Sequence, residues 1–176
     1  REQIVAAYPD GVLSRRTRPN DVVFRTSGTS GLFMEIAYAH EANDWLDAVY
    51  ARALLQTGYR PWHRFAYFWW EAKDKPLRSY ERLGLMRKQY LSLDPDPRVQ
   101  LRELRRIGPD YIYNFQSVMM MLARIVQSEG LGALSPQGII CHGEYMPKEI
   151  QREIARAFRC TVFNQYGAQE FNPMAR

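Results

Sequence analysis

The sequence is poor in the features that mark secreted, membrane-spanning or disordered proteins. It holds only two cysteines, Cys141 and Cys160, which excludes a disulfide framework of the secreted kind. Its apolar runs stay short of the roughly 20 residues that a membrane-spanning helix needs. No signal-peptide core follows the first residues. A soluble protein in the reducing cytoplasm, with no membrane partner, is therefore expected.

Charge is not gathered in one place either. The net charge is +5, but lysine and arginine are interspersed with aspartate and glutamate. The densest basic stretch, residues 98–106, matches the polar face of a helix, so a nucleic-acid partner is not expected. A length of 176 residues with 46% apolar residues fits one well-buried domain.

What the sequence does contain is an alternation of strand-like and helix-like segments. Strands are expected at residues 22–26, 35–39, 64–70, 111–115, 138–142 and 161–165. Helices are expected at residues 41–57, from the 94–97 turn to 107, at 117–128 and at 147–158. From Tyr111 onward the order is β-α-β-α-β with crossovers of helix length. This order predicts an α/β fold, a parallel sheet flanked by helices.

A loop rich in hydroxyl groups follows the first expected strand. Residues 25–31 read Arg-Thr-Ser-Gly-Thr-Ser-Gly. The glycines let backbone N–H groups turn toward an anion, and the hydroxyls add neutral donors, so the loop can wrap a pyrophosphate. It is not a Walker loop, because no Gly-Lys-Ser/Thr begins a helix here. A flexible turn joining two antiparallel strands is an equally good explanation.

Two further segments follow strands of the predicted sheet, where ligands of such sheets collect. Residues 141–145 read Cys-His-Gly-Glu-Tyr, and residues 164–170 read Asn-Gln-Tyr-Gly-Ala-Gln-Glu. A tyrosine at a strand end can stack on a planar base, and a following glycine lets the backbone approach that base. Glu170 is placed to reach a metal that bridges phosphates. The alternative is a core Tyr166 and a Glu170 favoured by a helix dipole.

The three segments together, in this order and at this spacing, resemble the adenylate-forming superfamily, and within it the phenylacetate–coenzyme A ligase branch. The resemblance runs from about Asp21 to Phe171 and includes the Gly-Pro-Asp entry to a strand at residues 108–110. It implies that residues 1–176 are part of the large, N-terminal nucleotide-binding domain of such an enzyme. Its implied activity is ATP- and Mg²⁺-dependent conversion of a carboxylic acid to an acyl-adenylate, then transfer to coenzyme A or another acceptor.

Roles for individual residues come from the same resemblance. The loop that holds the β- and γ-phosphates of ATP would be formed by Thr26, Ser27, Gly28, Thr29 and Ser30. The turn beside the adenine would be Gly143, Glu144 and Tyr145. The base edge, the stacking ring and the neighbour of the acyl phosphate would be Asn164, Gln165, Tyr166 and Gly167. Glu170 would help to hold Mg²⁺ and so take part in catalysis.

An acyl pocket is implied at the aromatic strand. Tyr67 and Trp70 fall where this branch places part of that pocket, and His142 would be a further wall, so an aromatic or bulky acid is expected. The alternative for any one of these aromatic residues is the core of the sheet. On the strand, Phe68 and Trp70 are expected to share one face and Trp69 the other.

The sequence departs from the family pattern at two places. Relatives often have proline and a nearby lysine after the phosphate loop, whereas this chain has Leu32, Phe33, Met34 and Glu35. The ribose-binding aspartate, the hinge and the C-terminal domain with its catalytic lysine have no counterpart in residues 1–176. These residues alone are therefore expected to bind nucleotide weakly and not to complete adenylation. A non-catalytic nucleotide- or acyl-binding module derived from the fold is the alternative.

A metal site is a further possibility at Cys141, His142 and Cys160. The three residues lack the usual spacing of zinc ligands, and buried strand residues explain them better.

Overall fold

The computed structural model describes residues 2–8, 10–13, 18, 21–25, 35–70, 77, 79–130, 134–168 and 171–175. The chain divides into two compact units, one of Arg1–Ala53 with Gly167–Met174, and one of Leu54–Tyr166 with Ala175–Arg176. Within the described part, every helix is too short or too polar to cross a membrane.

The first unit contains a two-stranded ribbon. Strands β1 (Val22–Arg25) and β2 (Glu35–Tyr38) pair antiparallel, with Val22 opposite Tyr38. The unit also contains α1 (Glu2–Ala7), most of α2 (His40–Gln56) and nearly all of β8 (Phe171–Ala175). Both strands that flank the hydroxyl-rich loop were predicted from the sequence. The loop itself, including Thr26, Ser27, Gly28, Thr29 and Ser30, lies outside the described residues.

The second unit is built on a parallel sheet, as the sequence predicts. Its strands are β3 (Phe65–Trp69), β4 (Lys88–Ser92), β5 (Tyr111–Phe115), β6 (Gly138–His142) and β7 (Thr161–Ala168). They are arranged in the order β4-β3-β5-β6-β7, with β8 next in the sheet, and each of the four pairings among the five is parallel. Gly167 and Ala168, at the end of β7, belong to the first unit.

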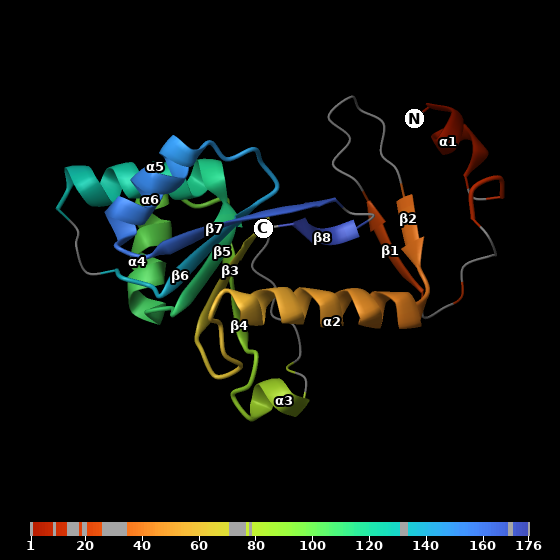
Figure 1. Ribbon diagram of the computed structural model, residues 1–176, viewed down its shortest axis with the longest axis horizontal. Helices are drawn as coiled ribbons and strands as arrows, with labels where there is room; N and C mark the ends of the chain where they lie inside the picture. The colour runs from red at the N-terminus through yellow and green to blue at the C-terminus, as the bar shows by residue number, and fades with distance from the viewer. Residues whose placement is uncertain are drawn as a thin grey trace. The chain divides into compact units, whose positions relative to one another are not determined.

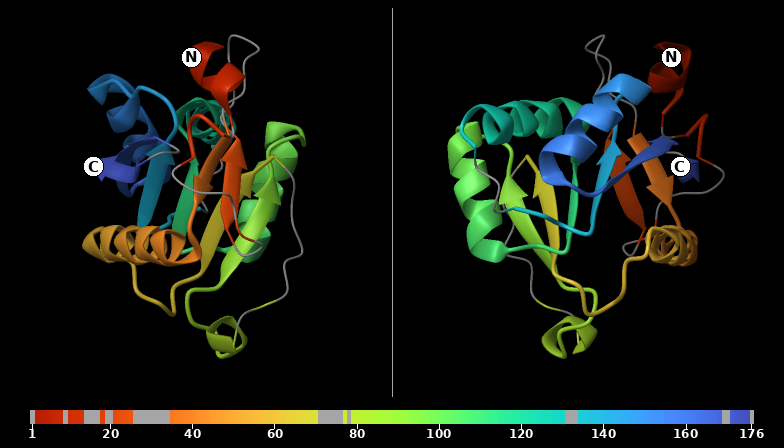
Figure 2. Two further views of the ribbon diagram at one scale, coloured as in Figure 1. Left: turned by 90° about the vertical axis from the view of Figure 1, so that its right-hand side faces the viewer. Right: turned by 60° about the vertical axis from the view of Figure 1, so that its left-hand side comes forward.

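Three helices cover one face of this sheet: α4 (Pro97–Ile107), α5 (Gln116–Ser128) and α6 (Lys148–Phe158), all visible on the same side of the strands (Figures 1 and 2). The core lies between helices and sheet. Its sheet side is formed by Ala66, Phe68, Ile112, Ile139, Cys141 and Val162, and its helix side by Leu101, Leu104, Met119, Leu122, Ala123, Val126, Ile154 and Phe158.

Helix α4 shows how local sequence sets an element's bounds. The Asp96 carboxylate accepts the N–H of Arg98 at 2.8 Å, and Pro97 occupies the first helical position. Leu101 and Leu104 then point to the core at helical spacing. Gly108 ends the helix in the left-handed conformation, with φ of 57°. These signals are local, which is why the sequence predicts both ends of this helix.

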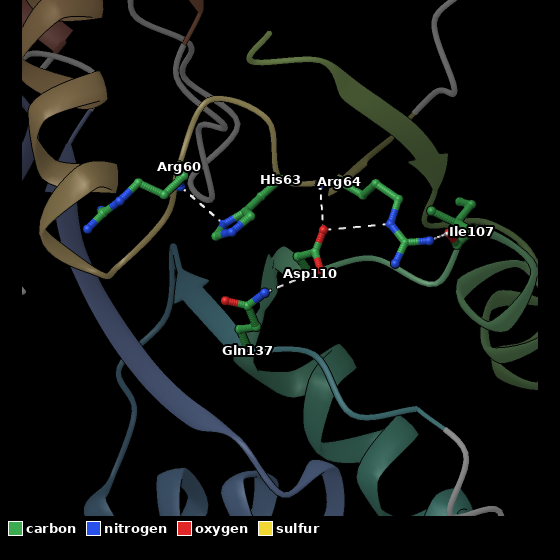
Figure 3. Close-up of polar contacts among 6 residues, drawn as sticks. All are labelled: Arg60, His63, Arg64, Ile107, Asp110 and Gln137. Carbon is green, nitrogen blue, oxygen red and sulfur yellow. Dashed lines mark hydrogen bonds and ion pairs between the residues drawn. The ribbon is translucent and has the colours of Figure 1, made fainter. Parts of the chain in front are cut away.

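At the amino ends of the strands, Asp110 joins three of them (Figure 3). Its carboxylate accepts the backbone N–H of Arg64 at 2.8 Å, which precedes β3, and the side-chain amide of Gln137 at 3.3 Å, which precedes β6. Its backbone carbonyl accepts the N–H groups of Gln137 and Gly138 at 2.8 and 3.3 Å. The first residues of β3, β5 and β6 are thus held at one level.

Several elements were not predicted from the sequence: α1, the short helix α3 (Ser79–Arg82), the strand β4 and the strand β8. The strand β7 was predicted to end at Gln165 but continues to Ala168, so Tyr166 and Gly167 are strand residues rather than loop residues. The strand β4 reads Lys-Gln-Tyr-Leu-Ser at the end of the sheet order, where a strand has one pairing partner and its sequence carries little apolar signal.

We predict that Asp110→Ala lowers the free energy of unfolding by about 1–3 kcal/mol, because it leaves the Arg64 N–H without its acceptor. Asp110→Asn is the matched variant, since it keeps an oxygen for that N–H. It loses chiefly the 3.6 Å ion pair with the exposed Arg64 side chain, which contributes little. Urea denaturation of both variants is the measurement. Equal losses in the two would show that the ion pair, and not the backbone hydrogen bond, carries the stabilisation.

Candidate functional site

The last residues of β5 and β6 lie at one level with an inner residue of β7. Phe115, the last residue of β5, is opposite His142, the last residue of β6, and His142 is opposite Gln165, three residues before the end of β7. The turn that follows β6 therefore begins beside Gln165. The register thus places the start of residues 143–145 next to Asn164 and Gln165, which belong to two of the three sequence segments predicted to bind nucleotide.

Aromatic rings form a continuous row on the sheet face opposite the three helices. Successive ring centroids are 5.4 Å apart between Tyr90 and Tyr67, 4.7 Å between Tyr67 and Tyr113, and 4.1 Å between Tyr113 and His142. From His142 the row continues to Phe115 at 4.6 Å, and from Phe115 to Trp70 at 5.8 Å. We call these six side chains the aromatic row. All three residues predicted to bind the acyl group, Tyr67, Trp70 and His142, belong to it.

Trp70 lies on the other side from the one that strand alternation predicts. Phe68 is fully buried in the helix-covered core, whereas Trp70 contacts Phe115 of the aromatic row and is 61% exposed. The shared face expected for Phe68 and Trp70 is therefore wrong. Its physical reason is that β3 ends at Trp69, so Trp70 no longer follows the pleat.

His142 is a neutral ring in contact with two aromatic neighbours. It stacks on Tyr113 with an interplanar angle of 19°, and it also contacts the ring of Phe115. Burial lowers the pKa of His142 from 6.5 to about 4. Its Nε2 atom is buried and has no hydrogen-bond partner within the described part of the chain. The side chain is thus uncharged at neutral pH and keeps an unused hydrogen-bonding nitrogen.

The turn after β6 requires a glycine. Gly143 has φ of 75°, a left-handed conformation that side chains disfavour, and a Cβ added there would lie 2.8 Å from a ring carbon of Phe115. The next residue, Glu144, accepts two hydrogen bonds from Ser117, at the start of α5. Tyr145 follows with 86% of its surface exposed. This ring is therefore available to a ligand.

The end of β7 offers a second exposed ring. Tyr166 is 65% exposed, which argues against the core position that was its alternative explanation. Gln165 is buried, and its side-chain amide donates to the Tyr113 hydroxyl at 3.4 Å, which links β7 to the aromatic row. Asn164 is opposite Cys141 in the register and is partly buried. Their roles beside a base stay predictions.

Among the residues that the structure describes, no three His, Cys, Asp or Glu side chains form a group that could hold a metal. Cys141 faces the helix-covered core, and His142 lies on the opposite face of the same strand. Burial raises the pKa of the Cys141 and Cys160 thiols to about 12, so neither is a ready thiolate ligand. The predicted Mg²⁺ residue, Glu170, lies outside the described residues.

Three residues of this region were not predicted from the sequence. Tyr113 and Phe115 both contact the His142 ring, and Ser117 binds Glu144. Ser117 carried a weak signal, since a serine beside a predicted helix start often takes part in capping. The aromatic contacts depend on strand order and register, which a single sequence does not specify.

A scan against models of protein families and a search of curated proteins each found no match. Solved structures do match. An open conformation of 2-hydroxyisobutyryl-CoA ligase, in complex with 2-HIB-AMP and CoA, has a TM-score of 0.70 and 17% identity, over 95% of this chain and 41% of that chain. VinN in complex with L-aspartate has a TM-score of 0.63 and 19% identity, over 91% and 41%.

A more distant match is a long-chain-fatty-acid-CoA ligase from Archaeoglobus fulgidus. Its TM-score is 0.60 and its identity 11%, over 86% of this chain and 32% of that chain. At such identities the likeness establishes the fold, an α/β fold like that of a part of these enzymes. The chain spans 32% to 41% of the length of these three proteins.

We predict that Gly143→Ala destabilises the protein by about 1–3 kcal/mol, because the new methyl group meets the Phe115 ring in a strained backbone conformation. Phe115→Leu in the same chain should recover part of this loss by removing the ring carbon. Thermal unfolding of the single and double variants gives the comparison. If the two substitutions are strictly additive, the close approach of Gly143 to Phe115 is not the cause.

We also predict that stability falls with acid through His142. The folded-state pKa lies below the unfolded value, so the unfolded chain binds more protons between pH 6.5 and about 4. The stabilisation is complete above pH 6.5, and on the order of 2 kcal/mol is lost as pH falls toward 4. His142→Phe keeps a ring but cannot titrate, so its unfolding free energy should change less between pH 7 and pH 4.5. Parallel pH curves for the two proteins would contradict this role.

Proposed function

We propose that the chain is part of the nucleotide-binding domain of an adenylate-forming ligase. In this proposal the whole protein uses ATP and Mg²⁺ to convert a carboxylic acid to an acyl-adenylate, and then transfers the acyl group to coenzyme A or another acceptor. The observation that carries the proposal is the pairing of Asn164 and Gln165 with the last residues of β6, directly before residues 143–145. Two motifs that are each predicted to contact adenine are thus brought together by paired strands.

The described residues fit a planar, uncharged base. The exposed rings of Tyr145 and Tyr166 offer apolar surfaces, and Gly143 brings bare backbone to the edge of the sheet. The neighbouring imidazole of His142 is neutral because its pKa is lowered to about 4. In the proposed site, Thr26, Ser27, Gly28, Thr29 and Ser30 hold the phosphates, and Glu170 helps to hold Mg²⁺, which neutralises phosphate charge.

The proposed chemistry asks the protein mainly to position the reactants. A carboxylate is already a nucleophile at neutral pH, so attack on the α-phosphate requires alignment and charge neutralisation rather than a general base. Pyrophosphate leaves as the acyl–phosphate bond forms. In this proposal the chain's own contribution is to orient the base, through the turn after β6 and the neighbouring residues of β7, and to orient the acid.

For the acid we propose an aromatic or bulky compound, in line with the phenylacetate–coenzyme A ligase branch that the motifs resemble. The support is the aromatic row, in which Tyr67, His142 and Trp70 are linked by ring contacts that end at the carboxyl edge of the sheet. Burial raises the pKa of the Tyr67 hydroxyl, so this ring is neutral too. An uncharged, aromatic wall favours an apolar acyl group. A cytoplasmic location and a small-molecule partner belong to the same proposal.

A second candidate is a non-catalytic nucleotide- or acyl-binding module with the same fold. It is favoured by Leu32, Phe33, Met34 and Glu35, which place no cation directly after the phosphate loop. The two candidates differ in ATP–pyrophosphate exchange driven by a panel of carboxylic acids. Exchange with any acid supports the ligase, and ATP binding without exchange in the full-length protein supports the module.

We predict that ATP with Mg²⁺ raises the melting temperature of the full-length protein. A ligand at 100 times its Kd, bound only to the native state, stabilises it by about 2.7 kcal/mol. Glu170→Gln should reduce the Mg²⁺-dependent part of the shift, because it removes a charge at nearly constant volume. Glu149→Gln, at an exposed acid in the first turn of α6, is the control and should behave as wild type. The absence of any shift at saturating ATP would refute both candidates as nucleotide binders.

A further inference from the structure

Both carboxylate oxygens of Glu144 are already engaged. One accepts the backbone N–H of Ser117 at 2.8 Å, and the other accepts the hydroxyl of Ser117 at 2.8 Å. Ser117 lies in the first turn of α5, where backbone N–H groups have no partner within the helix and negative charge is favoured. A carboxylate held in this way does not point toward the edge of a base.

Helix α5 has no cap from its own flanking sequence. Its N-cap residue is Phe115, whose side chain makes no capping hydrogen bond. Glu144 therefore caps the helix from a segment 27 residues away. Helix caps usually come from residues next to the helix. Here the cap connects the turn after β6 to the junction of β5 with α5.

The hydrogen bonds between Glu144 and Ser117 act together with a close contact. Gly143 lies against the ring of Phe115, which leaves no room for a side chain, and Glu144 binds Ser117, two residues after Phe115. The turn is thus fixed at two successive residues to one junction. Tyr145, the next residue, leaves this fixed turn with its ring exposed.

We propose that Glu144 is a positioning residue for the nucleotide. It orders the turn of Gly143, Glu144 and Tyr145 through Ser117, so that the base is met by the backbone of the turn and the Tyr145 ring, and not by the Glu144 carboxylate. The inference rests on the function proposed above. A turn that is ordered before binding loses little conformational entropy when the nucleotide binds, and this raises the affinity. The gain depends on the hydrogen bonds between Glu144 and Ser117.

The test is ATP–Mg²⁺ binding by isothermal titration calorimetry with the full-length protein. Glu144→Ala removes both hydrogen bonds and should raise the Kd by roughly three- to thirtyfold, the range that corresponds to loss of a helix cap. Ser117→Ala removes only the hydroxyl bond and keeps the backbone N–H, so it should raise the Kd by less. The double variant should be no weaker than Glu144→Ala, because that variant already lacks both hydrogen bonds. Glu144→Gln should stay within about twofold of wild type, since its oxygen can accept the Ser117 N–H and its amide can donate to the Ser117 hydroxyl.

Asp96→Ala is the matched control. It removes a cap of the same kind from α4, where the carboxylate accepts the Arg98 N–H, and it does not touch the turn. It should lower the melting temperature about as much as Glu144→Ala while leaving the Kd for ATP unchanged. A fall in affinity in Asp96→Ala equal to that in Glu144→Ala would reduce the effect to general stability and overturn the proposal.

Three other outcomes separate this inference from the function on which it rests. If wild type binds ATP and both alanine variants bind it equally well, the positioning role is wrong and the nucleotide site stands. If Glu144→Gln is as weak as Glu144→Ala, the charge of the carboxylate and not its hydrogen bonds to Ser117 sets the affinity, and the positioning role is again wrong. If wild type does not bind ATP at all, the proposed function fails and the positioning role fails with it.

Discussion

The hydrogen bonds of Asp110 at the amino ends of β3, β5 and β6 are the constraint from which the candidate site follows. Asp110 binds the backbone before β3 with its carboxylate and the start of β6 with its carbonyl. Parallel strands that begin at one level, and that have equal lengths of five residues, also end at one level. The alignment of Phe115 with His142 is therefore set by hydrogen bonds at the opposite end of these strands. A shift of one residue in β5 would move Tyr113 and Phe115 of the aromatic row to the helix-covered face.

The two faces of the sheet have different chemistry for the same reason. On one face, Phe68, Ile112 and Cys141 pack under three helices and form the core. On the other, Tyr67, Tyr113 and His142 stack in a row that crosses three strands. Aromatic side chains supply large contact areas, while their hydroxyl and imidazole groups keep some polarity. The alternation of side chains between the two faces of each strand thus gives the protein both its core and its candidate binding surface.

The sequence predicted those parts of the fold whose signals are local. Helix α4 has an N-cap aspartate, a proline at its first position and a terminating glycine, and its bounds were confirmed. Strands β5 and β6 are short, apolar runs between clear turn residues, and they were confirmed as well. The strand β4 was missed because lysine, glutamine and serine make up most of its five residues. The side of Trp70 was wrong because the exact end of β3 decides it, and strand ends are set by pairing with neighbours rather than by the strand's own residues.

The candidate site shows the same division between local and long-range information. Gly143 was identified from its motif, but the Phe115 ring that excludes a side chain at this position belongs to another strand. Glu144 was assigned by resemblance to the turn beside the adenine, and its hydrogen bonds to Ser117 connect that turn to helix α5. This changes the electrostatic description of the edge of the sheet. With Glu144 bound to a helix N-terminus and His142 neutral from burial, neither residue presents an uncompensated charge to a ligand. In the proposed site, recognition of a neutral base would then come from ring surfaces and backbone groups, which are the features that Tyr145, Tyr166 and Gly143 provide.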